Sequence, residues 1–159
     1  MKRIAIDTMV VDLIADTPGL LAGVRVAVSR GALKLLVTHL SHDQITAIPD
    51  TARRSKLIAV WNALPTTTLA TRVGVLGLPR LDEFQLRDGT ESGARVPDVR
   101  PSAEIGGAAE ALIAIVASGD ADVLATGDVR LRAKAMKAGV ACEAWSLDQF
   151  VAFVKDRAK

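Results

Sequence analysis

Three carboxylates occur where a parallel β-sheet would place its chemistry. Asp7 follows a short hydrophobic strand predicted at Arg3–Ile6, and Asp128 follows another predicted at Asp122–Ala125. Parallel strands deliver the residues after their carboxyl ends to one edge of the sheet, so we expect both acids there. Glu110 lies near the start of an amphipathic helix that leads directly into the second strand, and a short connection would return it to the same edge. The pattern predicts three convergent acids.

Each acid also has a simpler interpretation. Asp7 and Asp128 both precede a predicted helix, where aspartate is a common N-cap, and Glu110 would be stabilised by the amino-terminal end of its own helix. Chemistry is favoured by the pairing, because carboxylates gathered in one pocket repel one another unless a divalent cation neutralises them. Hard oxygen ligands suit Mg²⁺ or Mn²⁺, which are the expected cofactors.

The rest of the chain alternates short β-rich runs with longer runs of helical period, as in a parallel α/β sheet. Further strands are predicted at Leu33–Val37 and Val140–Ala144, while residues 66–78 fit either a strand or irregular chain. The polar segment 79–107 is expected to be a long loop, either functional or disordered. Helices are predicted at Met9–Val28 with a break at Pro18-Gly19, Ser41–Ala47, Pro49–Leu64 with Pro49 in its first turn, Ala108–Ala117, Val129–Ala138 and Ser146–Lys155.

Composition limits the possible classes of protein. The 159 residues fit a single domain over 1–159, which is long enough to bury a core without disulfides or a structural metal. Half of the residues are hydrophobic but only 3% are aromatic, so the core is aliphatic and a protein that stacks a strand of bases on many rings is disfavoured. The net charge of +2 means that any nucleic-acid binding must be local.

The chain also gives indications of its compartment. Cys142 is the only cysteine, which excludes an internal disulfide and a cysteine-rich zinc site and favours a reducing compartment. The amino terminus reaches Asp7 after too few apolar residues for a signal peptide, and no stretch is apolar enough to span a bilayer. We therefore expect a cytoplasmic protein without a membrane partner.

The motifs resemble those of PIN domains. The resemblance is carried by Ile6-Asp7-Thr8, by the helix start Glu110-Ala111-Leu112-Ile113-Ala114 and by Ala125-Thr126-Gly127-Asp128, and the spacing of the last two acids also fits. Between them, Leu36-Val37-Thr38-His39, Asp43-Gln44-Ile45 and Arg53-Arg54 are similar to the second strand and following helix of bacterial members of the VapC type. Short motifs spread over nearly the whole chain carry the likeness.

This resemblance implies a three-layer α/β/α fold with a mainly parallel sheet of about five strands. It implies a divalent-metal-dependent endoribonuclease, the toxin of a toxin–antitoxin pair, with an RNA substrate, an antitoxin protein as partner and a homodimeric state. Asp7, Glu110 and Asp128 would be the catalytic acids and metal ligands, with Thr8 and Thr126 as nearby hydroxyls.

Gln44 is the main departure from the family pattern, which has an acid there, usually Glu. Asp43 is adjacent, but one residue along a helix turns the side chain by about 100°, so it would replace that acid only after local rearrangement. A neutral amide contributes no charge, so we expect weakened metal binding and weakened cleavage. The alternative is a PIN-like RNA- or protein-binding module that has lost catalysis. Glu110 is a smaller departure, since Asp is commoner at that position.

Basic residues supply a possible contact for RNA. Arg130 and Lys134 fall at helical spacing just after Asp128, and Arg53 and Arg54 lie on another predicted helix. Such charges usually form a solvated face, but beside the acids they would hold the phosphates of an RNA backbone. The two histidines, at positions 39 and 42, are expected to cap a helix or lie at the surface rather than act as a general base.

Two other folds that place acids at strand ends fit less well. A haloacid-dehalogenase-like phosphatase needs a second Asp two residues after the first, and Met9 stands there instead. A phosphoacceptor receiver domain needs an acidic pair before the end of its first strand and a Lys after a late strand, and neither is present.

Overall fold

A five-stranded parallel sheet forms the centre of the protein. In the computed structural model the described residues are 1–69, 113–114, 117, 119–137 and 142–159. The strands lie in the order β3-β2-β1-β4-β5, and every neighbouring pair is parallel. Their bounds are β1 Lys2–Ile6, β2 Leu33–Thr38, β3 Thr66–Leu69, β4 Val123–Ala125 and β5 Glu143–Trp145. The prediction of a mainly parallel α/β sheet is confirmed.

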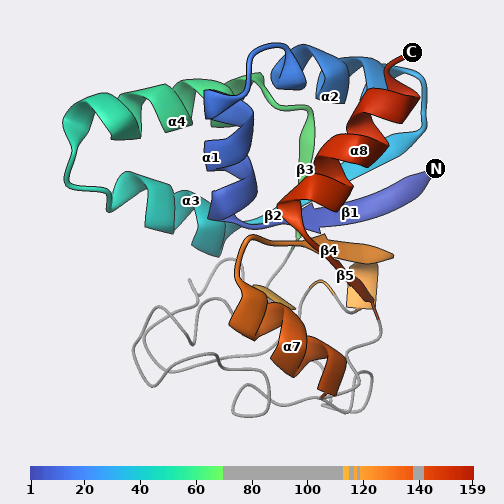
Figure 1. Ribbon diagram of the computed structural model, residues 1–159. Coiled ribbons are helices and arrows are strands. Elements are labelled where there is room, and N and C mark those ends of the chain that lie inside the picture. Colours follow the sequence, from blue (N-terminus) through green and yellow to red (C-terminus); the bar gives the residue numbers. More distant parts are fainter. Residues whose placement is uncertain (70–112, 115–116, 118, 138–141) are drawn as a thin grey trace.

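Helices cover both faces of this sheet, which gives three layers. Helices α1, α2 and α8 lie over one face and α7 lies on the other, while α3 and α4 extend to the side of the sheet (Figure 1). The helix bounds are α1 Thr8–Asp16, α2 Leu20–Ser29, α3 His39–Thr46, α4 Thr51–Ala63, α7 Val129–Lys137 and α8 Leu147–Arg157.

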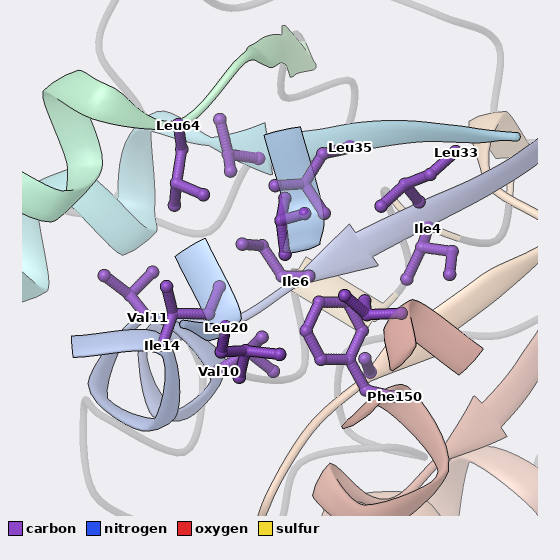
Figure 2. Close-up of a cluster of buried hydrophobic side chains, with 14 of the residues drawn as sticks. Ile4, Ile6, Val10, Val11, Ile14, Leu20, Leu33, Leu35, Leu64 and Phe150 are labelled. Carbon is purple, nitrogen blue, oxygen red and sulfur yellow. The ribbon is translucent and has the colours of Figure 1, made fainter. Parts of the chain in front are cut away.

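The alternation of side chains along β1 explains the two layers of packing. Ile4 and Ile6 join the larger buried cluster, to which α1, α2 and α8 contribute (Figure 2), and Ala5 faces a smaller cluster that includes Leu131 of α7. Phe150 of α8 is wholly buried in the larger cluster. Successive residues of a strand point to opposite faces, so a run of apolar residues is what a sheet covered on both sides requires.

Local signals set most element boundaries where they were predicted. Pro18 and Gly19 separate α1 from α2, and Gly19 adopts the left-handed conformation with φ 79°. Ser146 caps α8 with a capping box. The start of α4 differs from the prediction: the Asp50 side chain accepts hydrogen bonds from the first turn, so Pro49 lies outside the helix. An aspartate N-cap supplies acceptors that proline lacks.

The undecided segment 66–78 begins as a strand, because Thr66–Leu69 pairs with β2. The rest of that segment, the predicted loop 79–107 and Glu110 lie outside the described residues. Of the predicted helix Ala108–Ala117, only residues 113–114 and 117 are described, and they are helical. Within the described chain, no helix is long and apolar enough to cross a membrane.

Replacement of Phe150 tests this packing. Phe150→Ala leaves a cavity beneath α8 and should lower the free energy of unfolding by about 3–5 kcal/mol in urea denaturation. Lys155→Ala, on the exposed side of the same helix, should change it by no more than about 0.5 kcal/mol. Equal effects of the two substitutions would show that α8 does not pack on the sheet as described.

Candidate active site at the carboxyl edge of the sheet

The register of β1 against β4 brings the two predicted aspartate motifs together. Ile6 pairs with Ala125, so Asp7 and Thr126 are the next residues on two neighbouring strands. The Asp7 backbone N–H donates to the Ala125 carbonyl at 3.4 Å, and the Thr126 hydroxyl donates to the Asp7 carboxylate. Both strands therefore end at one shared group of polar atoms.

Thr126 also connects this group to Asp128. Its Oγ1 accepts a hydrogen bond from the Asp128 backbone N–H at 3.0 Å, so one hydroxyl lies between the two acids. The Asp128 side chain accepts from the N–H groups of Arg130 at 2.7 Å and Leu131 at 3.0 Å, both through Oδ1. Asp128 is thus oriented by the first turn of α7, and among the described residues its Oδ2 keeps its acceptor capacity for a ligand.

Asp7 combines capping with deep burial. Its side chain accepts from the Val10 N–H at 3.1 Å and so caps α1, as its simpler interpretation expects. The side chain belongs to a residue that is only 4% exposed, and this burial raises the pKa of Asp7 to about 6, with the charge of Asp128 adding to the effect. The hydrogen bonds from Thr126 and from the helix start oppose the rise.

Gln44 lies at the same edge. The Thr8 hydroxyl donates to Gln44 Oε1 at 3.4 Å, which places the amide beside the residue that follows Asp7. Asp43 is half-buried one residue earlier on α3. The structure therefore brings together Asp7, Thr8, Gln44, Thr126 and Asp128 and leaves Glu110 outside the described residues.

Buried polar side chains mark this edge more widely than sequence reasoning predicted. Across the described residues, every buried polar or charged residue follows or ends β1, β2 or β4: Asp7, Thr38, His39, Ser41 and Thr126. Burial of polar groups costs free energy, so their concentration at one edge indicates a functional constraint. Thr38 was part of a recognised motif, but Ser41 was missed because a lone serine early in a helix carries no distinctive signal.

The histidines differ from their predicted roles. Thr38, not a histidine, caps α3 through the Ser41 N–H, and His39 is buried in the first turn of that helix. His42 is half-buried with its ring 5.5 Å from the Trp61 ring. The prediction of capping or surface positions was wrong because the strand end buries the first turn of α3.

Two further residues shape the turn between Thr126 and Asp128. Arg132 of α7 donates from its guanidinium to the Thr126 carbonyl at 2.6 Å and holds the turn from its carboxyl side. Gly127 lies under Met9 of α1, since a Cβ at Gly127 would stand 2.5 Å from the Met9 Cε. The glycine of the Thr-Gly-Asp turn therefore allows the first turn of α1 to close over the site.

The predicted RNA-contact residues occupy different environments. Arg53 pairs with Asp12 and Asp16 of α1, and the Arg54 guanidinium donates to the Ile48 carbonyl at 2.8 Å. On α7, by contrast, Arg130 is exposed and Lys134 is half-buried, and both follow Asp128 directly.

No cluster of three or more metal-ligating His, Cys, Asp or Glu side chains occurs within the described ranges. Asp7 and Asp128 fit a hard dication as two carboxylates, with a hydroxyl and an amide carbonyl nearby. Their partners among the described residues are N–H groups and a hydroxyl rather than basic side chains. The pair therefore retains negative charge for a cation.

No protein-family model matches the chain, and a search of curated proteins finds no match. The resemblance to PIN domains accordingly remains a prediction that rests on the motifs.

The raised pKa of Asp7 predicts how apo stability depends on pH. The folded pKa lies near 6 and the unfolded one near 3.8, so the folded state binds the proton more tightly. The contribution of Asp7 should therefore fall by up to about 1.4 kcal/mol per pH unit between these values as pH rises.

Urea denaturation in EDTA at pH 4 to 7 measures this effect. Asp7→Asn keeps a side-chain acceptor for the α1 cap but cannot titrate, so its stability relative to wild type should increase across this range. A difference between the two proteins that stays constant with pH would contradict burial of an ionisable Asp7.

Proposed function

We propose that this chain is a divalent-metal-dependent endoribonuclease with a PIN-like fold, acting as the toxin of a toxin–antitoxin pair. The observation that carries the proposal is the pair of Asp7 and Asp128 at neighbouring strand ends, bridged by the Thr126 hydroxyl. Two carboxylates placed this closely, one of them buried, favour occupation by a cation.

Asp7 and Asp128 are the proposed ligands for Mg²⁺ or Mn²⁺, with Glu110 as the predicted third acid and Gln44 as a neutral donor. A bound dication would polarise the phosphate of the substrate and lower the pKa of a coordinated water. In the apo protein the burial that raises the pKa of Asp7 favours a proton there, so cation binding should release protons near neutral pH.

The chain's own residues orient these acids. Thr126 donates to Asp7 and accepts from the backbone of Asp128, which restricts both carboxylates. Groups held in advance need no reorganisation when the substrate arrives, and this lowers the barrier to reaction. Asp7 and Asp128 would then position the attacking water and accept its proton.

RNA would approach along α7. Arg130 and Lys134 follow Asp128 on this helix and are the proposed phosphate contacts. Arg53 is held by two acids of α1, so its main role in this proposal is to join α4 to α1. An antitoxin partner and a homodimer belong to the proposal through the family resemblance.

Cleavage assays with purified protein test the function. Single-stranded RNA should be cut in Mg²⁺ or Mn²⁺ and left intact in EDTA. Asp7→Asn and Asp128→Asn should each lower the cleavage rate by about a hundredfold or more, because each removes a charge from the metal site.

Asp50→Asn is the matched control, since Asp50 caps α4 in the same manner without joining this site. It should cleave like wild type. Cleavage that survives EDTA, or that is unaffected by both site variants, would assign the activity to a contaminant.

Gln44 favours a second candidate, a PIN-like RNA- or protein-binding module without catalysis. Its amide contacts Thr8 at the site but supplies no charge where the family pattern has an acid. Under this alternative the protein binds RNA or a protein partner through the same edge but does not cut RNA at any metal concentration.

The substitution Gln44→Glu separates the two candidates. A weakened enzyme should bind Mn²⁺ about tenfold more tightly and cleave faster at low metal concentration, because a carboxylate attracts a dication more strongly than an amide does. Calorimetry and cleavage assays measure both effects. Thr46→Glu adds the same charge to an exposed position of α3 and should change neither. Failure of Gln44→Glu to cleave at any metal concentration would favour the binding module.

A further inference from the structure

Cationic and aromatic side chains alternate along the side of the molecule formed by β1, β5 and α8. The Lys2 ammonium lies 5.0 Å from the centroid of the Trp145 ring. That ring packs against Phe153 at 5.3 Å, and the Arg157 guanidinium lies 5.6 Å from the Phe153 centroid. The chain has only two Trp and three Phe, so two of its five aromatic rings meet here. Cation–π contacts of this kind hold each charge in a defined place.

A hollow of about 420 Å³ opens beside this series of side chains. Phe153 and Ala32 form part of its apolar lining, and Lys2 and Arg157 contribute its basic groups. Hollows of roughly 300–1,000 Å³ take small organic ligands, and one nucleotide falls within this range.

The charges of the hollow favour an anion. Its acidic residue, Asp122, is compensated by Arg3, whose guanidinium contacts Oδ1 at 2.8 Å and whose backbone N–H contacts Oδ2 at 2.7 Å. The same pairing lowers the pKa of Asp122, so it holds no proton at neutral pH. This leaves the two basic residues of the lining, Lys2 and Arg157, to determine what binds.

The ion pairs of those two residues are weak. Lys2 reaches Glu143 at 3.4 Å, and Arg157 reaches Asp156 at 3.5 Å, with all four side chains largely accessible to water. Exposed pairs of this type contribute little, so a phosphate can compete for both cations.

We propose that this hollow binds one unpaired nucleotide of RNA, with its base against Phe153 and its phosphate between Lys2 and Arg157. The scarcity of aromatic residues argues against a long stacking surface but leaves room for a single base site. An apolar ring beside two cations is the combination that single-stranded nucleic acid requires. RNA is chosen as the ligand because the inference rests on the proposed ribonuclease function.

This site is separate from the acids. Lys2 begins β1 and Asp7 follows its end, so the two lie roughly 17 Å apart along the strand at ~3.3 Å per residue. A strand of a few nucleotides would reach from one site to the other. The hollow would therefore hold an unpaired part of the substrate while another part lies at the acids.

Fluorescence anisotropy with a labelled, unstructured hexaribonucleotide in EDTA tests the proposal without cleavage. The double variant Lys2→Gln/Arg157→Gln should bind about tenfold more weakly at low salt. Its plot of log K against log salt concentration should be shallower by about 1.4, since each phosphate contact with a single strand contributes roughly 0.7. Lys155→Gln/Lys159→Gln removes the same charge from other positions at the end of the chain and should bind like wild type.

Phe153→Leu separates base contact from charge. It preserves bulk against Trp145 but removes the ring, and it should weaken binding of the hexaribonucleotide by about fivefold. Equal binding by the Lys2→Gln/Arg157→Gln and Lys155→Gln/Lys159→Gln variants would overturn the proposal. So would full binding by Phe153→Leu, because the hollow would then respond to charge alone.

The two proposals can fail separately. If these variants lose binding as expected but the wild-type protein cleaves no RNA, the nucleotide site stands and the ribonuclease proposal fails. If Asp128→Asn abolishes cleavage while the Lys2→Gln/Arg157→Gln variant binds normally, the reverse holds.

Discussion

The parallel pairing of β1 with β4 is the constraint on which the candidate site depends. Its register aligns Ile6 with Ala125, and this alignment alone makes Asp7 and Thr126 neighbours. A shift of one residue would turn the side chains after both strand ends toward the wrong faces and separate the hydroxyl from the carboxylate. The hydrophobic packing of both faces of β1 maintains that register, so the core and the site have a common origin.

The site is held at a cost to the fold. Asp7 is buried beside a second acid, and Thr38 and Ser41 are buried at the next strand end. Capping and chemistry, which the sequence presents as alternatives, coexist in the structure: Asp7 and Asp128 each accept N–H groups from the helix that follows. Capping orients a carboxylate without neutralising it. This arrangement is suited to binding a cation and also accounts for the raised pKa of Asp7.

Much of this fold could be predicted because local signals agree with the packing. Apolar runs ending in Asp7 and Asp128 indicated neighbouring strands, and Pro18-Gly19 correctly divided the first helical region. What could not be predicted depends on contacts distant in sequence. The burial of His39 follows from the way α3 leaves β2, and the pairing of Arg53 with acids of α1 requires α4 to fold back. The meeting of Lys2 with Trp145 likewise joins opposite ends of the chain.

The central claim is that Asp7 and Asp128 share one divalent cation. The most direct measurement is anomalous X-ray scattering from crystals of the protein soaked in Mn²⁺. The account predicts a single strong peak within about 2.0–2.5 Å of carboxylate oxygens from both residues, as hard oxygen ligands require. A well-ordered site with no peak between them, at a Mn²⁺ concentration that saturates the protein in calorimetry, would contradict it.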